Sequence, residues 1–74
     1  MIYCVKYDEV RRYLLHMGYS QDSEFDNTIL FTRGREIVTL RRPNVDGNVP
    51  EMLVNGALEA AGLNPPMWLV FWCD

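Results

Sequence analysis

Residues 25–40 read FDNTILFTRGREIVTL, and this stretch predicts a β-hairpin at the centre of the fold. Phe25–Thr32 is rich in β-branched and aromatic side chains, which favour a strand. Arg33-Gly34 then predicts a tight turn, because glycine takes a positive φ at little cost. Glu36–Leu40 is the expected returning strand. A weaker strand over about residues 20–24 would pair with the first one through a short turn.

A helix over about residues 8–17 is predicted on the N-terminal side of the hairpin. Val10, Leu14 and Met17 recur at spacings of four and three, which places them on one helical face. Asp8 is a suitable N-cap, since its carboxylate can accept hydrogen bonds from the free amides of the first turn. Gly18 follows at the position where a left-handed residue commonly ends a helix.

A second helix is predicted after a loop over residues 43–47. Asn48 is the expected N-cap, and Glu51 stands in the capping-box position three residues later. Gly62 is expected to end the helix, with Leu63 as its hydrophobic partner. The apolar stripe of this helix consists of Leu53, Val54, Ala57, Leu58 and Ala61. Two helices flanking antiparallel strands give an α+β fold.

The two ends of the chain leave alternatives open. Met1–Lys6 has the composition of a short strand or an ordered arm. Residues 65–73 form an apolar C-terminal tail, in which the run Met67–Trp72 is apolar on every side. Because proline is tolerated in a first helical turn, Asn64 could cap a short third helix, which is the alternative we prefer. The other alternative is a strand that pairs with residues 2–6.

Composition indicates one globular domain over residues 1–74, since 49% of the residues are apolar and 23% are charged. The longest apolar run has seven residues, whereas a membrane span needs about 20. We therefore expect a cytoplasmic protein with no membrane partner, in which Cys4 and Cys73 are reduced thiols. If these two cysteines met, the two ends of the chain would be adjacent. One histidine and no ligand cluster predict no metal site and no cofactor.

The charge distribution is uneven. A net charge of −3 argues against generic nucleic-acid binding, which relies on an excess of basic residues. Two local groups of arginines could nevertheless form a basic face, and the alternative is that they are ordinary solvated side chains. They are Arg33, Arg35, Arg41 and Arg42 around the hairpin, and Arg11 and Arg12 in the first helix.

Several segments resemble the HicA toxin family. Residues 9–19, EVRRYLLHMGY, resemble the opening helix of that family, which closes with leucines, a glycine and an aromatic residue. Residues 57–63, ALEAAGL, resemble the end of its second helix, and residues 35–40 fit its third strand. The resemblance spans about residues 8–69. It implies a double-stranded-RNA-binding-domain-like α-β-β-β-α fold, with both helices packed on one face of a small antiparallel sheet.

The resemblance also implies a function. HicA toxins cut messenger RNA and are blocked by a partner antitoxin, HicB. Their catalysis is assigned to a histidine at the start of the second strand, where an imidazole can move a proton during attack by a ribose hydroxyl. The matching positions here are about Asp26, Asn27 and Thr28, and threonine cannot act as a general base. His16 is interpreted as a surface residue of the first helix, so no catalytic residue is assigned.

The sequence supports two alternative functions. The first is a HicA-like RNA-binding protein with absent or much reduced interferase activity, which contacts phosphates through the six arginines and has RNA and a HicB-like antitoxin as candidate partners. The second is a protein-interaction module on the same scaffold, which binds an antitoxin-type partner or a second copy of itself. It would use the C-terminal tail, with Trp68, Phe71 and Trp72 as candidate interface residues.

Overall fold

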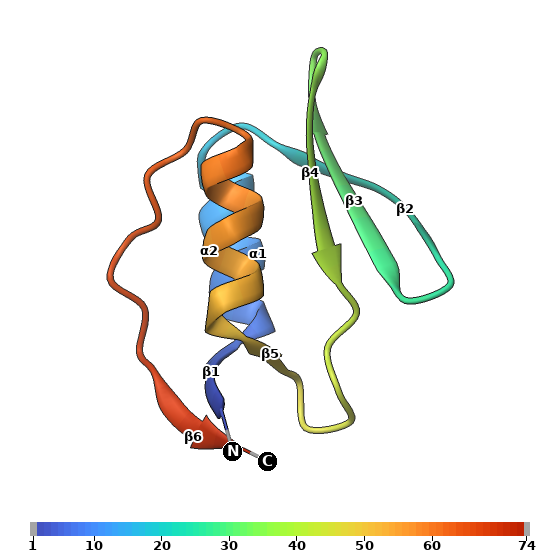
Figure 1. Ribbon diagram of the computed structural model, residues 1–74. Coiled ribbons are helices and arrows are strands. Elements are labelled where there is room, and N and C mark those ends of the chain that lie inside the picture. The colour runs from blue at the N-terminus through green and yellow to red at the C-terminus, as the bar shows by residue number, and fades with distance from the viewer. Residues whose placement is uncertain (1, 74) are drawn as a thin grey trace.

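The computed structural model describes residues 2–73. Within this range two helices and six strands follow one another in the order β1-α1-β2-β3-β4-β5-α2-β6 (Figure 1). The helices are α1 (Tyr7–His16) and α2 (Glu51–Ala60), and the strands are β1 (Ile2–Lys6), β2 (Ser20–Phe25), β3 (Thr28–Arg33), β4 (Glu36–Arg41), β5 (Asn48–Pro50) and β6 (Phe71–Cys73). The strands form two antiparallel sheets, in the orders β2-β3-β4 and β5-β1-β6.

The predicted hairpin is confirmed as β3 and β4. The two strands pair without interruption from Thr28 opposite Arg41 to Arg33 opposite Glu36, and Gly34 in the turn has a φ of 60°. The weaker third strand is confirmed as β2. It extends to Phe25, which the sequence analysis placed in the following strand, because the chain turns at residues 26–27. Every residue of β2 is exposed, so this strand is held by backbone pairing rather than by burial.

The α+β class is confirmed, but the expectation of one small sheet is wrong. The order α1-β2-β3-β4-α2 matches the expected α-β-β-β-α sequence of elements. However, β1, β5 and β6 build a second sheet, of which the sequence analysis gave only the pairing of residues 2–6 with the tail, as one of two alternatives. Residues 4–6 of β1 pair with β5 on one side, and residues 2–4 pair with β6 on the other. The second sheet forms because β1 satisfies its backbone groups with the segment before α2 and the end of the chain.

The hydrophobic core lies between the helices and the β3–β4 hairpin. Alternation along the two strands directs Ile29 and Phe31 of β3 and their partners Leu40 and Val38 of β4 to the buried face. The helices and the second sheet cover this face with further buried side chains, namely Val10 and Leu14 of α1, Val54 and Leu58 of α2, Val5 of β1 and Val49 of β5. The core therefore draws on both sheets.

Both helices end as predicted. After α1, Gly18 has a φ of 91°, its amide donates to Leu15, and the amide of Tyr19 donates to Leu14 at 2.9 Å. After α2, Gly62 has a φ of 78° and the amide of Leu63 donates to Leu58 at 2.9 Å. This pattern is the Schellman motif, which satisfies carbonyls in the last turn.

The predicted starts of both helices are wrong. Asp8 lies inside the first turn of α1 and makes no capping hydrogen bond, because the helix begins at Tyr7. Asn48 is paired with Lys6 in β5, and the N-cap of α2 is Pro50, so α2 begins two residues later than predicted, at Glu51. The pairing of β5 with β1 keeps Asn48 in a strand and so prevents it from capping α2. Asp8 and Glu51 still favour their helices, since acidic groups in a first turn oppose the positive end of the helix dipole.

The C-terminal tail is not a third helix, so the alternative we preferred is wrong. Residues 63–70 have no regular secondary structure, and the chain then enters β6, which pairs with β1 in the register Tyr3 opposite Trp72. Figure 1 shows this segment descending from the end of α2 to the side of β1. The strand alternative is confirmed for residues 71–73.

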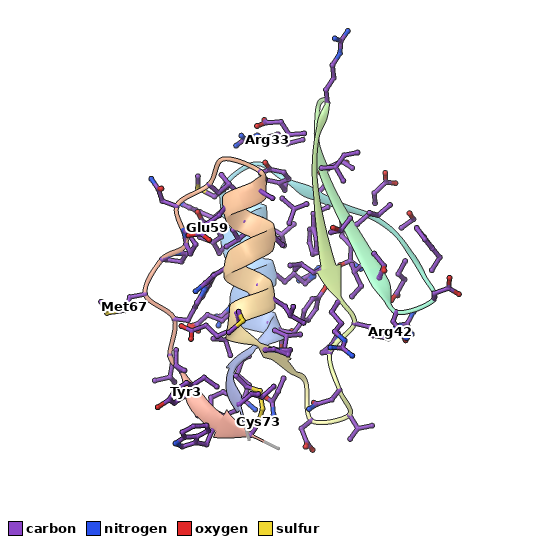
Figure 2. The ribbon with its side chains drawn as sticks, in the orientation of Figure 1. Tyr3, Arg33, Arg42, Glu59, Met67 and Cys73 are labelled. Carbon is purple, nitrogen blue, oxygen red and sulfur yellow. A yellow bond between two sulfur atoms is a disulfide. The ribbon has the colours of Figure 1, made fainter. Side chains whose placement is uncertain are left out.

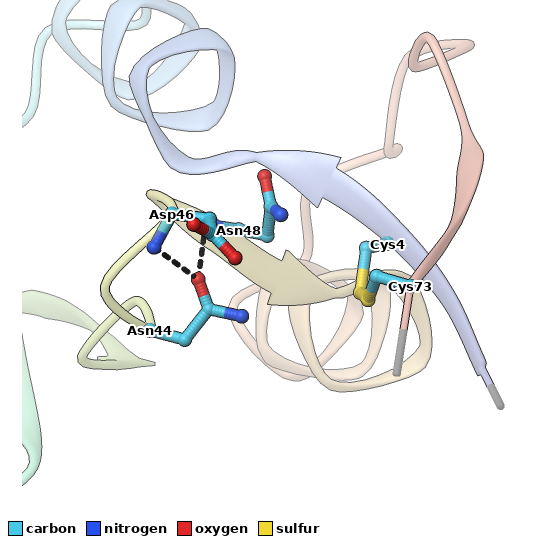
Figure 3. Close-up of a disulfide and its surroundings, with 5 residues drawn as sticks. All are labelled: Cys4, Asn44, Asp46, Asn48 and Cys73. Carbon is cyan, nitrogen blue, oxygen red and sulfur yellow. Dashed lines mark hydrogen bonds between the residues drawn. A yellow bond between two sulfur atoms is a disulfide. The ribbon is translucent and has the colours of Figure 1, made fainter.

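A disulfide between Cys4 and Cys73 joins the two end strands, with a Cα–Cα distance of 6.0 Å (Figure 3). The prediction of two reduced thiols is therefore wrong for this structure. The pairing of β1 with β6 is what brings cysteines 69 positions apart into bonding range. No helix among residues 2–73 is long and apolar enough to cross a membrane.

Candidate interaction surface

Two aromatic rings stack on the outside of the second sheet. Tyr3 and Trp72 are direct cross-strand partners, so their side chains leave the same face of the sheet. Their ring centroids lie 4.2 Å apart with 24° between the planes. Tyr3 is 51% exposed and Trp72 is 57% exposed. The stack therefore shields one side of each ring and leaves the other side to solvent.

Side chains from the start of α2 extend this apolar area. Met52 and Leu53 are exposed, as is Ile2 of β1. Together with the two aromatic residues they line a surface pocket of about 460 Å³, to which Pro50, Arg41 and Glu51 also contribute. We call the five exposed apolar residues of this pocket the end-strand face: Ile2, Tyr3, Met52, Leu53 and Trp72. Monomeric proteins rarely leave large apolar side chains clustered in this way without a use.

Sequence analysis found only one residue of the end-strand face. Trp72 was a candidate interface residue, whereas Leu53 was expected in the core stripe of α2 and is instead 47% exposed. Tyr3 carried one usable signal, since it alternates with Cys4 and so points away from the buried side of a half-covered strand. No sequence signal indicated that Met52 is exposed, because its exposure depends on the residue at which α2 begins.

The other two predicted interface residues, Trp68 and Phe71, are less exposed than Trp72. Trp68 is 6% exposed and belongs to the core, where its Nε1–H donates to Oδ1 of Asn55 at 2.8 Å. Its ring meets Tyr13 edge to face, at 5.5 Å between centroids. Phe71 is partly buried, and the ammonium of Lys6 lies 5.3 Å from its ring centroid. Of the three predicted residues, only Trp72 presents a largely exposed ring.

The six candidate RNA-binding arginines do not gather on one surface. Arg33 and Arg35 lie at the turn of the β3–β4 hairpin, while Arg41 and Arg42 lie at its other end. Figure 2 labels Arg33 and Arg42 at these two ends. Six residues of extended strand separate Arg35 from Arg41, which corresponds to about 20 Å. Arg11 and Arg12 lie apart from both groups, on α1. A phosphate-binding face through all six is not preassembled.

Several of these arginines already have partners. Arg33 forms a salt bridge with Glu36 at 2.8 Å, and this hydrogen-bonded contact raises the pKa of Arg33. It also donates to the carbonyl of Met17 at 2.8 Å and lies 4.6 Å from the ring centroid of Tyr19. Arg42 pairs with Glu24 at 3.2 Å, and Arg11 donates to Gln21 at 3.2 Å. Arg33 is thus primarily a structural residue.

The three positions that the sequence analysis compared with the HicA catalytic motif carry no histidine. Asp26 and Asn27 form the turn between β2 and β3, and Thr28 begins β3 opposite Arg41. His16 is the last residue of α1, exposed to solvent. Within residues 2–73, no three side chains of histidine, cysteine, aspartate or glutamate come together as a metal-binding group.

Comparison of the chain with models of protein families, with curated proteins and with solved structures found no match. Its function is therefore inferred from its own residues.

Proposed function

We propose that the protein is a non-catalytic interaction module that forms a homodimer through the end-strand face. The single observation behind this proposal is the stacked pair of Tyr3 and Trp72, more than half exposed, at the edge of an apolar pocket. Aromatic residues and methionine are the side chains most enriched in protein interfaces. Buried aromatic anchors commonly supply most of the binding energy.

A second copy of the chain is the partner that the charges favour. The pocket carries one cation, Arg41, and one anion, Glu51, beside the same apolar surface. We place the two-fold axis so that Arg41 of one protomer meets Glu51 of the other, and this contact then occurs twice, because residue contacts across such an axis are reciprocal. A heterologous partner would need a matching pair of charges, whereas this chain supplies both.

The size of the molecule is compatible with such a dimer. A standard interface takes about 800 Å² from each partner, which is about one sixth of the 5026 Å² of accessible surface here. The five apolar residues would form its centre. β6 lies at the same place and, within residues 2–73, pairs with β1 alone, so the backbone groups on its outer edge can contribute hydrogen bonds to the interface.

The proposal is tested by measuring mass against concentration with sedimentation equilibrium. We expect a monomer–dimer equilibrium for the oxidised protein and a monomer for Trp72→Ala. Met67→Ala is the matched control, because Met67 is fully exposed and apolar but lies on the tail outside the pocket (Figure 2). A monomeric native protein at every accessible concentration, or a dimer unaffected by Trp72→Ala, contradicts the proposal.

Charge reversal tests the two-fold arrangement separately. Arg41→Glu places two pairs of like charges across the interface, as does Glu51→Arg, so each variant alone should be monomeric. An equimolar mixture of the two variants restores both opposite-charge pairs and should form a heterodimer. A mixture that remains monomeric would show that Arg41 and Glu51 do not meet across the axis.

A HicA-like RNA-binding function is the second candidate, and the proximity of Arg41 and Arg42 to one pocket favours it. Its test is titration of labelled double-stranded and single-stranded RNA at two salt concentrations, with a gel to detect cleavage. Salt-dependent binding that is lost in the Arg41→Ala/Arg42→Ala variant would support this candidate. Absence of binding at low salt would remove RNA from consideration.

A further inference from the structure

We infer that the pocket over the Cys4–Cys73 disulfide is a site of thiol–disulfide exchange with a small anionic thiol. This pocket has a volume of about 380 Å³ and is distinct from the pocket of the end-strand face, although both contain Ile2, Arg41 and Pro50. Both cysteines line it. Its remaining residues are Asn27, Arg42 and Asn44.

The two sulfur atoms are not equally accessible. Cys4 is 1% exposed, whereas Cys73 is partly exposed at the edge strand β6 (Figure 3). Attack on a disulfide requires in-line approach to one sulfur, and the exposed partner is the one that can be reached without unfolding. The position of the attack is therefore assigned to Sγ of Cys73.

The surroundings of the disulfide attract an anion. Arg41 and Arg42 both line the pocket, and Arg41 has no ion pair among residues 2–73. Arg42 is partly neutralised by Glu24. The side-chain oxygen of Asn44 accepts hydrogen bonds from the backbone amides of Asp46 and Asn48, which leaves the amide NH₂ of Asn44 as a donor (Figure 3). Cationic surroundings favour both the thiolate form and a carboxylate-bearing or sulfonate-bearing reagent.

The exchange proceeds in two balanced steps. A small thiolate attacks Sγ of Cys73, the protein S–S bond breaks, and its electron pair leaves on Sγ of Cys4, which then takes up a proton. A second thiolate attacks the outer sulfur of the mixed disulfide and releases Cys73 as a thiolate, which is protonated in turn. Two small thiols are thereby oxidised to a disulfide as the protein disulfide is reduced. The small disulfide is the oxidant for the reverse reaction.

Exchange at this site would regulate the end-strand face, an extension that rests on the proposed dimer. β6 has three residues and, among residues 2–73, pairs with β1 alone, and the disulfide cross-links the same two strands. Release of Cys73 frees the strand that carries Trp72, and the stack on Tyr3 is lost with it. The oxidised chain would then be competent to dimerise and the reduced chain would not.

The exchange site is tested by the rate of reduction of dilute, monomeric protein. The probes are 2-mercaptoethanesulfonate, which is anionic, and cysteamine, which is cationic, with rates expressed per thiolate. We expect the anionic thiol to react about tenfold faster than the cationic thiol or more. In Arg41→Gln/Arg42→Gln the two thiols should react at similar rates. Arg11→Gln/Arg12→Gln is the matched control and should keep the faster reaction of the anionic thiol. Equal rates for the two thiols, or a rate independent of thiol concentration, would overturn the assignment, because the latter indicates reaction through global unfolding.

A second measurement separates the two proposals. Sedimentation and hydrogen exchange are compared for oxidised protein and for Cys4→Ser/Cys73→Ser. We expect the variant to lose protection at residues 71–73, to keep it in the β3–β4 hairpin, and to be monomeric. A dimer that still forms in the variant without both cysteines overturns the regulation and leaves the dimer proposal standing. An oxidised monomer with a thiol preference as above overturns the dimer and leaves the exchange site standing.

Discussion

The indole N–H of Trp68 donates a 2.8 Å hydrogen bond to the side-chain oxygen of Asn55, which holds the C-terminal tail against α2. This contact separates the two tryptophans of the tail. Trp68 fills the core and has its only polar atom satisfied, whereas Trp72, four residues later, is largely exposed. The two residues should therefore respond to substitution in opposite ways.

Trp68→Ala should lower the free energy of unfolding by about 3–5 kcal/mol, because it empties a large buried site. Asn55→Ala should cost about 1–3 kcal/mol, since it leaves the indole N–H buried without an acceptor. Trp72→Ala should cost less than Trp68→Ala and act mainly on association. Urea unfolding monitored by circular dichroism measures all three. Equal losses for Trp68→Ala and Trp72→Ala would contradict the burial described above.

Two glycines should respond to alanine with opposite signs. Gly18 has a φ of 91°, and an added Cβ would lie 3.4 Å from Cδ of Arg33, so Gly18→Ala should destabilise the protein by about 1–2 kcal/mol. Gly56 lies inside α2 with no atom within 4 Å of an added Cβ. Gly56→Ala should therefore stabilise the protein by about 0.5–1 kcal/mol. Thermal unfolding of the two variants side by side tests the difference in sign.

Arg33 and Arg35 form a matched pair at the hairpin turn. Arg33 contacts Glu36, the carbonyl of Met17 and the ring of Tyr19, whereas Arg35 is exposed in the turn. Arg33→Ala should lower the midpoint of thermal unfolding, and Arg35→Ala should leave it unchanged. Added salt should reduce the difference between the two unfolding midpoints only in part, because salt screens the contacts of Arg33 with the carbonyl and the ring less than it screens the ion pair. Identical midpoints for the two variants would show that these contacts contribute nothing.

Tyr7 should make stability depend on alkaline pH. Its hydroxyl is buried without a hydrogen-bond partner, and burial, assisted by Glu24 and Asp8 against the opposing effect of Arg11, raises the pKa of Tyr7 above 10.0. The unfolded chain therefore loses this proton first. The free energy of unfolding should be unaffected by this group below pH 10.0 and should fall as the pH rises through the folded-state pKa.

Tyr7→Phe is the variant that isolates this effect. It removes the titrating hydroxyl and an unsatisfied buried group together, so it should be neutral or slightly stabilising near neutral pH. Above pH 10.0 its stability should fall less steeply than that of the native protein. Parallel curves for the two proteins across this range would contradict a raised pKa at Tyr7.

The sequence alone predicted the features that depend on near neighbours. The hairpin followed from β-branched residues on either side of a glycine turn, and both helix ends followed from Gly18 and Gly62. These features are set by side chains and backbone torsions within four or five residues, so their signal is local. The same local rules failed at Asn48, which has a side chain suited to an N-cap. Asn48 is instead a strand residue, because it pairs with Lys6 of β1, 42 positions away.

The candidate site was decided by tertiary structure. The stack of Tyr3 on Trp72 and the disulfide between Cys4 and Cys73 both require one pairing between the two ends of the chain. The burial of Trp68 requires the tail to pack on Asn55 of α2 and Tyr13 of α1. Nothing within either end specifies that pairing, since each is a short apolar segment that could pair with any open strand edge. The sequence by itself therefore determined the helices, their ends and the hairpin. The fold as a whole decided which of two tryptophans is core and which is surface, because burial depends on contacts between segments that are distant along the chain.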